Sequence, residues 1–164
     1  PNSRPAPPRT LPSIPPRLSS VLYRESAAEH LSIPHTYEAW GFGDSSKMAD
    51  SLGAMVRDGI KTATASLVWA YEAEGEPLPE VGDYSIILNG RGDPMCIIQT
   101  TKVTILPFNE VDAEQAYLEG EGDRSLAFWR DAHWTFFGRE CAGLGREPSQ
   151  EMLVVCERFK LVYP

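Results

Sequence analysis

At 164 residues, the chain has the length of a single globular domain, and its 42% hydrophobic and 23% charged residues are ordinary values for that class. The net charge of −8 disfavours a long groove for a nucleic-acid backbone but does not exclude a local basic pocket. No apolar run approaches the ~20 residues of a membrane span, and no apolar stretch follows the first positive charges, so we expect a cytoplasmic protein without a secretory signal.

The chain begins with a proline-rich stretch, residues 1–18, which we expect to be a flexible tail because proline suits neither helices nor strand ladders. One domain is predicted over residues 19–164, starting with a short helix over 19–31. A turn at 40–44 precedes a helix over 45–58, for which Asp44 or Ser45 supplies the N-cap and Gly59 suits the left-handed residue at the end.

The middle of the chain is predicted to consist mostly of strands. Residues 62–69 favour a strand, and an acidic loop with two prolines follows at 72–80. Strands at 84–88 and 94–106 flank the sequence Asn89-Gly-Arg-Gly-Asp93, which is a strong signal for a hairpin turn.

The C-terminal third is predicted to hold two helices and a strand. Residues 112–115 resemble a capping box that starts a short helix ending near Gly120, a second helix spans 125–138, and a strand covers 151–163. This order of elements predicts an α+β fold, a small mixed β-barrel with helices flanking its openings. Cys96 and Cys156 lie in apolar strand-like runs and, with Cys141, show no disulfide spacing, which favours buried free thiols.

Lys61 and Thr64, in the stretch Gly59-Ile-Lys61-Thr62-Ala-Thr64, form the first candidate site. A lysine between a helix end and a strand can lose water, which lowers its pKa and makes it a base or a ligand for an anion. A threonine hydroxyl needs such a base to act as a nucleophile. In a straight strand the two residues would point to opposite faces, so they converge only if 59–63 is a turn; otherwise Lys61 is solvated and Thr64 is a plain strand residue.

The acidic stretch Glu119-Gly-Glu-Gly-Asp123 is the second candidate. Three carboxylates within five residues suit a hard cation, although the spacing matches no calcium loop. The alternatives are a solvated loop, or a carboxylate that neutralises and orients Lys61. The three histidines and the cysteines lack metal-ligand spacing, so no structural zinc site is expected.

The third candidate is one helix with Ser125, Trp129, Arg130 and His133. Residues three and four apart share a helix face, and an indole, a guanidinium and an imidazole suit base stacking and phosphate contact. The alternative is that Trp129 belongs to the core and Arg130 pairs with an acid. Trp40 and Phe42 likewise suit either the core or a pocket wall.

Taken in order, these stretches resemble the ASCH (activating-signal cointegrator homology) domain of the PUA-like superfamily, in its bacterial free-standing type. The resemblance runs from about residue 39 to the C-terminus and rests on Trp40-Gly-Phe-Gly-Asp44, Ala49-Asp50, Gly59-Ile-Lys-Thr-Ala-Thr64, Glu76-Pro-Leu-Pro79, Val81-Gly82-Asp83, Pro94, Glu119-Gly-Glu-Gly-Asp123, Ser125-Leu126, Trp129-Arg130 and His133.

The resemblance implies a PUA-like β-barrel with a cleft beside the Gly59–Thr64 turn, in a superfamily that typically binds RNA or modified bases. One small member type is an amidohydrolase of N4-acylated cytidine, whose lysine, threonine and glutamate fall on Lys61, Thr64 and Glu119. Another type, closer in length to this chain, is described as a ribonuclease whose lysine also falls on Lys61. The Trp129-Arg130-His133 helix is not part of the amidohydrolase pattern.

We therefore expect a hydrolase for a nucleoside, nucleotide or short single-stranded RNA, with Lys61, Thr64 and Glu119 as catalytic residues. The expected substrate-binding residues are Trp40, Phe42, Gly59, Thr62, Ser125, Trp129, Arg130 and His133. No cofactor and no metal ligand are expected, and a divalent cation enters only in the ribonuclease version. Neither a membrane nor extended duplex DNA is an expected partner. A non-catalytic module that binds RNA or a modified base, and a protein-interaction domain, are the alternatives.

Overall fold

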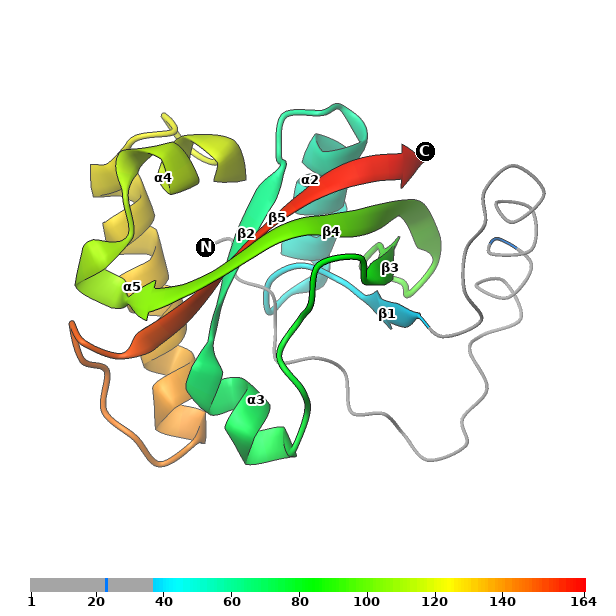
Figure 1. Ribbon diagram of the computed structural model, residues 1–164. Coiled ribbons are helices and arrows are strands. Elements are labelled where there is room, and N and C mark those ends of the chain that lie inside the picture. Colours follow the sequence, from blue (N-terminus) through cyan, green and yellow to red (C-terminus); the bar gives the residue numbers. More distant parts are fainter. Residues whose placement is uncertain (1–22, 24–36) are drawn as a thin grey trace.

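The sheet of this protein carries the fold. A computed structural model describes Tyr23 and residues 37–164, and the strands there form one sheet in the order β1-β3-β4-β5-β2 (Figure 1). Its strands are β1 (Glu38–Trp40), β2 (Ala63–Leu67), β3 (Tyr84–Leu88), β4 (Pro94–Pro107) and β5 (Leu153–Tyr163). β1 runs parallel to β3 and the other pairs are antiparallel. The mixed sheet curls into a half-barrel, which confirms the predicted α+β, PUA-like fold.

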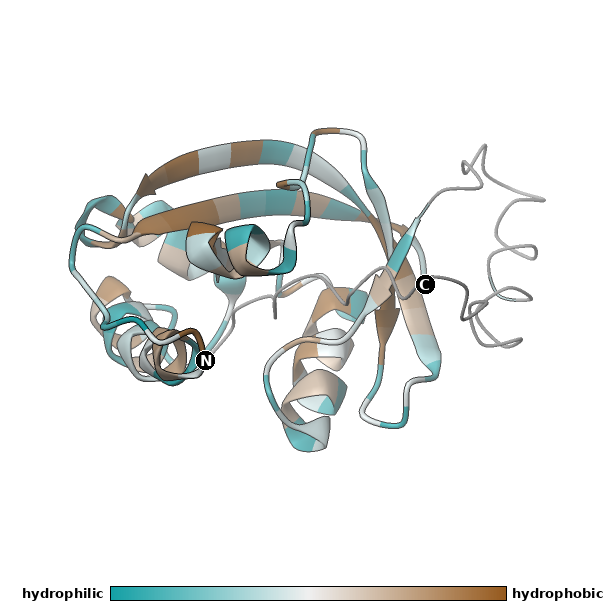
Figure 2. Cartoon of the chain, turned by 90° about the horizontal axis from the view of Figure 1, so that it is seen from below, coloured by the Kyte–Doolittle hydropathy of each residue, from teal (hydrophilic) through white to brown (hydrophobic). Residues whose placement is uncertain are grey.

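Helices cover the two ends of the long strands. They are α2 (Ser46–Arg57), α3 (Val68–Glu74), α4 (Ala113–Glu119) and α5 (Leu126–Gly143), with a 3-10 turn, η1 (Phe108–Glu110), before α4. In Figure 1, α4 and α5 lie together at one end of β4 and β5, and α2 lies at the other. Figure 2 shows the two long strands bowing over these helices.

Local capping signals account for the boundaries that were predicted correctly. The Ser45 hydroxyl accepts a hydrogen bond from the Met48 amide at the start of α2, and Gly59 takes the expected left-handed conformation after its end. Asp112 caps α4 through the Gln115 amide, and α4 ends at a left-handed Gly120. The predicted hairpin, the strand over 84–88 and the long strand that follows are confirmed.

Helix α3 and strand β1 were not predicted, and α5 was predicted to end too early. Residues 68–74 form α3 instead of the end of a strand and the start of a loop. The helix buries Ala70 and Tyr71, but its start has no side-chain N-cap that the sequence could have revealed. α5 continues to Gly143 instead of stopping near 138, because buried Phe137 and Cys141 hold the next turn against the core.

The core consists of two main clusters on either side of the curled sheet. One cluster packs α5 and α4 against Leu67, Val154 and Cys156, and the other packs α2 against Ile98 and Phe159. Cys96 and Cys156 are free and buried, as predicted, and Cys141 is free and buried as well. In the part of the chain described, no helix is both long and apolar enough to cross a membrane. The predicted tail (1–18) and the helix predicted over 19–31 lie outside the described residues, Tyr23 excepted, and the division into tail and domain stays a prediction.

Candidate functional site

The segment 59–62 is the backbone of the candidate site, and three elements hold it. The amides of Ile60 and Lys61 both donate to the Met55 carbonyl oxygen at the end of α2. The Thr62 amide donates to Leu118 O on α4, and Thr62 O accepts from the Phe159 amide on β5. The segment is therefore the turn that the convergence of Lys61 with other groups requires.

The side chain of Lys61 turns inward from this segment and is 1% exposed. Its ammonium donates a hydrogen bond to the Ala63 carbonyl oxygen over 2.7 Å and lies 5.0 Å from the centre of the Phe42 ring. Burial lowers the pKa of Lys61, while the charges of Glu119 and Glu121 act in the opposite direction. The prediction of a desolvated lysine is thus matched by its geometry, and a solvated Lys61 is ruled out.

Glu119, the last residue of α4, is the matching buried acid. It is also 1% exposed, and one carboxylate oxygen, Oε2, accepts a hydrogen bond from the indole Nε1 of Trp129. Burial raises the pKa of Glu119 well above its usual range, and the positive charge of Lys61 opposes this shift. The pKa values of Lys61 and Glu119 therefore move toward each other, as expected for groups that can exchange a proton.

His133 extends this arrangement by one turn of α5. Its ring stacks on Trp129 with centroids 4.1 Å apart, and its Nδ1 lies 2.8 Å from the Trp129 carbonyl oxygen. A carbonyl only accepts, so Nδ1 carries a proton, and Nε2 faces Glu119 Oε2 over 3.7 Å. Glu119 thus lies beside an imidazole, is oriented by an indole, and is near enough to Lys61 for the two charges to interact.

Thr64 lies on β2 among groups that were not predicted. It is fully buried and pairs in register with Glu157 of β5, so both side chains share one face of the sheet. Glu157 is buried as well and accepts a hydrogen bond from the Thr100 hydroxyl over 2.9 Å. The signal for Glu157 was in the sequence, since it is a carboxylate inside the apolar run of the last strand.

The remaining predicted residues occupy different places. Trp40, Phe42 and Trp129 are buried in the core, and Ser125 caps α5. Arg130 lies on the exposed side of α5, away from His133, where its guanidinium donates to the Asn109 carbonyl oxygen over 3.4 Å. The predicted face of indole, guanidinium and imidazole is therefore split, since only the indole and the imidazole face Glu119.

The acidic loop after α4 closes over the Lys61 segment. Burial raises the pKa of Glu121, while Lys61 counteracts this shift, and Asp123 accepts from the Ser125 amide. Arg124, which has a φ of 64°, donates to the carbonyl oxygens of Tyr117 and Ile60. Among the described residues, no group of three or more His, Cys, Asp and Glu side chains is arranged to hold a metal ion.

The curled mixed sheet with its helices is that of an α+β PUA-like domain, and comparisons with known proteins give the family. The model of the ASCH domain family matches residues 38–163, so the chain belongs to this family. The crystal structure of an ASCH domain from Lactobacillus crispatus JV V101 is similar, with 37% identity, a TM-score of 0.80, and coverage of 89% of this chain and 95% of that one.

A protein from Enterococcus faecalis V583 is similar too, with 39% identity, a TM-score of 0.79 and coverage of 88% of each chain. No curated protein matches the chain. ASCH domains are generally associated with RNA.

Proposed function

We propose that this protein is a hydrolase acting on a nucleoside or a short single-stranded RNA, centred on Lys61. The observation that carries the proposal is the burial of both Lys61 and Glu119, each 1% exposed, and this burial displaces their pKa values toward each other. A buried lysine and a buried glutamate both cost stability, and such costs are concentrated at functional sites. The family's association with RNA supplies the class of ligand.

In the amide-cleaving version, Thr64 supplies the nucleophilic hydroxyl. Its oxygen attacks the acyl carbon while neutral Lys61 accepts the hydroxyl proton and then passes it to the leaving amine. Water next attacks the acyl ester, which releases the carboxylic acid and restores the Thr64 hydroxyl. Glu119 orients Lys61 throughout, and the lowered pKa of Lys61 keeps a larger share of its amine neutral.

In the ribonuclease version, Lys61 keeps its proton and stabilises negative charge that develops at phosphorus. A divalent cation is an option only in this version. The net charge of −8 favours a nucleoside or a short strand over a long RNA in either case.

A binding module without catalysis is the alternative, and one observation favours it. The Lys61 ammonium already donates to the Ala63 carbonyl oxygen and rests on the Phe42 ring, as a purely structural lysine would. In that case the same site recognises one base or nucleotide.

Turnover on a panel of acylated cytidines and short single-stranded RNAs separates these readings. We expect wild-type protein to hydrolyse one of the two classes and Lys61→Met to lose turnover while keeping its circular dichroism spectrum. Lys160→Met, which removes an exposed lysine on β5, is the matched control and should keep full activity. Binding without turnover by wild-type protein would instead establish the binding module.

A further inference from the structure

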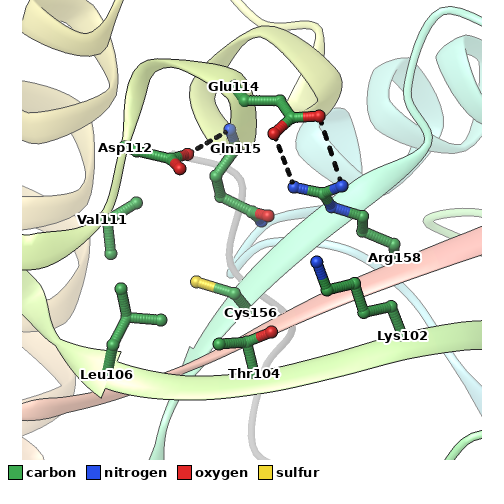
Figure 3. A pocket seen from close by; sticks show the side chains of 9 residues that line it. All are labelled: Lys102, Thr104, Leu106, Val111, Asp112, Glu114, Gln115, Cys156 and Arg158. Carbon is green, nitrogen blue, oxygen red and sulfur yellow. Dashed lines mark hydrogen bonds and ion pairs between the residues drawn. The ribbon is translucent and has the colours of Figure 1, made fainter.

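A second polar cavity lies at the first turn of α4, one helical turn before Glu119 (Figure 3). Its volume is about 140 Å³, and it is enclosed by the first turn of α4 and by strands β4 and β5. The walls combine apolar and polar side chains, as ligand sites do. They are Lys102, Thr104, Leu106, Val111, Asp112, Glu114, Gln115, Cys156 and Arg158.

A β-bulge aims Lys102 at this cavity. The pairing of β4 with β5 shifts between Thr100 and Lys102, so Thr100 pairs with Phe159 and Lys102 with Arg158. Without the extra residue, alternation would place Lys102 on the same face as Thr100, which is buried beside Glu157. Bulges that redirect one side chain are typical of functional sites.

Two cations consequently stand opposite each other across the strands. Like charges in this position destabilise a sheet, which makes the pair of Lys102 and Arg158 unexpected on stability grounds. Glu114 neutralises Arg158 through two contacts of 3.4 Å. Among the described residues, no carboxylate pairs with Lys102, so its ammonium is available at the rim of the cavity.

The opposite wall of the cavity presents acceptors. The Nε2 of Gln115 is committed to the Thr64 carbonyl oxygen over 3.1 Å, which leaves its Oε1 for a ligand. Asp112 accepts the Gln115 amide with Oδ1 and retains Oδ2. In Figure 3 the tip of Gln115, the Cys156 thiol and the Lys102 ammonium point into the same space. Burial raises the pKa of the Cys156 thiol, so the floor is neutral.

We infer that this cavity binds one pyrimidine nucleotide whose base carries an exocyclic amine, with the phosphate on Lys102 and the amine on Asp112 and Gln115. This inference rests on the proposed function, because the family's association with RNA names the ligand class. The cavity admits a single ring, and its acceptors reject a carbonyl oxygen at the position of the amine. Gln115 precedes Glu119 by four residues of α4, roughly 6 Å along the helix, so the two adjoining sites would take neighbouring nucleotides of one strand.

An NMR titration of the ¹⁵N-labelled full chain tests the inference. The probes are cytidine 5′-monophosphate, uridine 5′-monophosphate and ribose 5-phosphate, and the reporter is the side-chain amide of Gln115. We expect the cytidine nucleotide to move this signal at lower concentration than the other two. Lys102→Met should weaken its binding roughly tenfold, as expected for the loss of one charge-assisted contact, and Lys160→Met should leave it unchanged. Asp112→Asn, which keeps a capping side chain, should reduce the preference for the cytidine nucleotide.

Equal responses to the three probes, or equal effects of the two lysine variants, would overturn the inference. The indole N–H of Trp129 reports separately on Glu119, to which it donates. If a short RNA moves the Trp129 signal and leaves Gln115 unaffected, the proposed function stands and the second nucleotide site is refuted. If the cytidine nucleotide moves Gln115 while no panel substrate is hydrolysed, the second site stands and the hydrolase fails.

Discussion

Replacing Lys61 and Glu119 singly and together measures whether the two buried groups act as a pair. Both are 1% exposed, so each single replacement leaves the other charge buried without its counter-charge. Removal of one partner of a buried pair costs up to about 3–5 kcal/mol. Because the pKa displacement lets the remaining group become neutral, we expect a smaller loss, roughly 1–3 kcal/mol of the free energy of unfolding, for Lys61→Met and for Glu119→Gln.

The double variant should be more stable than the sum of the single effects implies. Two neutral side chains of similar volume replace the pair, and we expect its stability to lie within about 1 kcal/mol of wild type. The coupling free energy should then be roughly 1–3 kcal/mol. Urea unfolding followed by tryptophan fluorescence at about pH 7 supplies all four values.

Additivity within about 0.5 kcal/mol would refute the pairing of Lys61 and Glu119, and with it the basis of the proposed function. The control cycle combines Glu119→Gln with Lys160→Met, and this cycle should be additive because Lys160 is exposed on β5. The coupling should also fall in acid, where Glu119 becomes protonated, and in alkali, where Lys61 loses its proton.

Substitutions at three further positions test other parts of the structure. Burial and neighbouring carboxylates raise the pKa of Glu140 from 4.5 to about 8, so the folded state retains a proton that the unfolded chain releases, and stability falls as pH rises through this interval. Glu140→Gln should therefore match wild type at about pH 4 and exceed it by roughly 1–2 kcal/mol at about pH 9 in urea unfolding, and an equal difference at both pH values would contradict this. Arg124→Ala and Arg124→Gly both lose the contacts to Tyr117 and Ile60, but only glycine adopts a φ of 64° without strain. We therefore expect the glycine variant to be more stable than the alanine variant by about 1 kcal/mol in thermal unfolding. The reverse order would exclude backbone strain at this position. Gly120→Ala, at a φ of 79°, would bring its Cβ to 2.8 Å from Ile60 O, and we expect a loss of about 2 kcal/mol together with lower activity; unchanged stability would show that the loop yields freely.

Elements with a local signal were predictable from the sequence. Ser45 and Gly59 mark both ends of α2 by capping chemistry, and the Asn89–Asp93 turn fixes the hairpin between β3 and β4. α3 lacks such a signal at its start, since Leu67 offers no side chain to cap the helix. Gly138 was a misleading signal for the end of α5, because a glycine with open space around it is tolerated inside this helix.

The candidate site was predictable only in part, because some of its contacts have no local signal in the sequence. Lys61 and Glu119 carry a recognisable pattern, but the contact of Glu119 with Trp129 and His133 depends on how α4 packs against α5. The placement of Glu157 beside Thr64 depends on the register of β2 with β5, which links residues about ninety positions apart. Nothing in the local sequence encodes such distances, because they follow from long-range pairing.

The bulge in β4 lets one continuous strand serve two separate hydrophobic layers. Before it, even-numbered residues such as Ile98 face the layer beneath α2; after it, even-numbered residues such as Leu106 face the layer beneath α5. A strand of constant phase would supply only one of these layers and would turn its other half outward. The alternation of side chains along β4 thus changes phase at Thr101. Deletion of Thr101 would leave every core residue in the sequence, but the residues on one side of the deletion would then face the wrong side of the sheet.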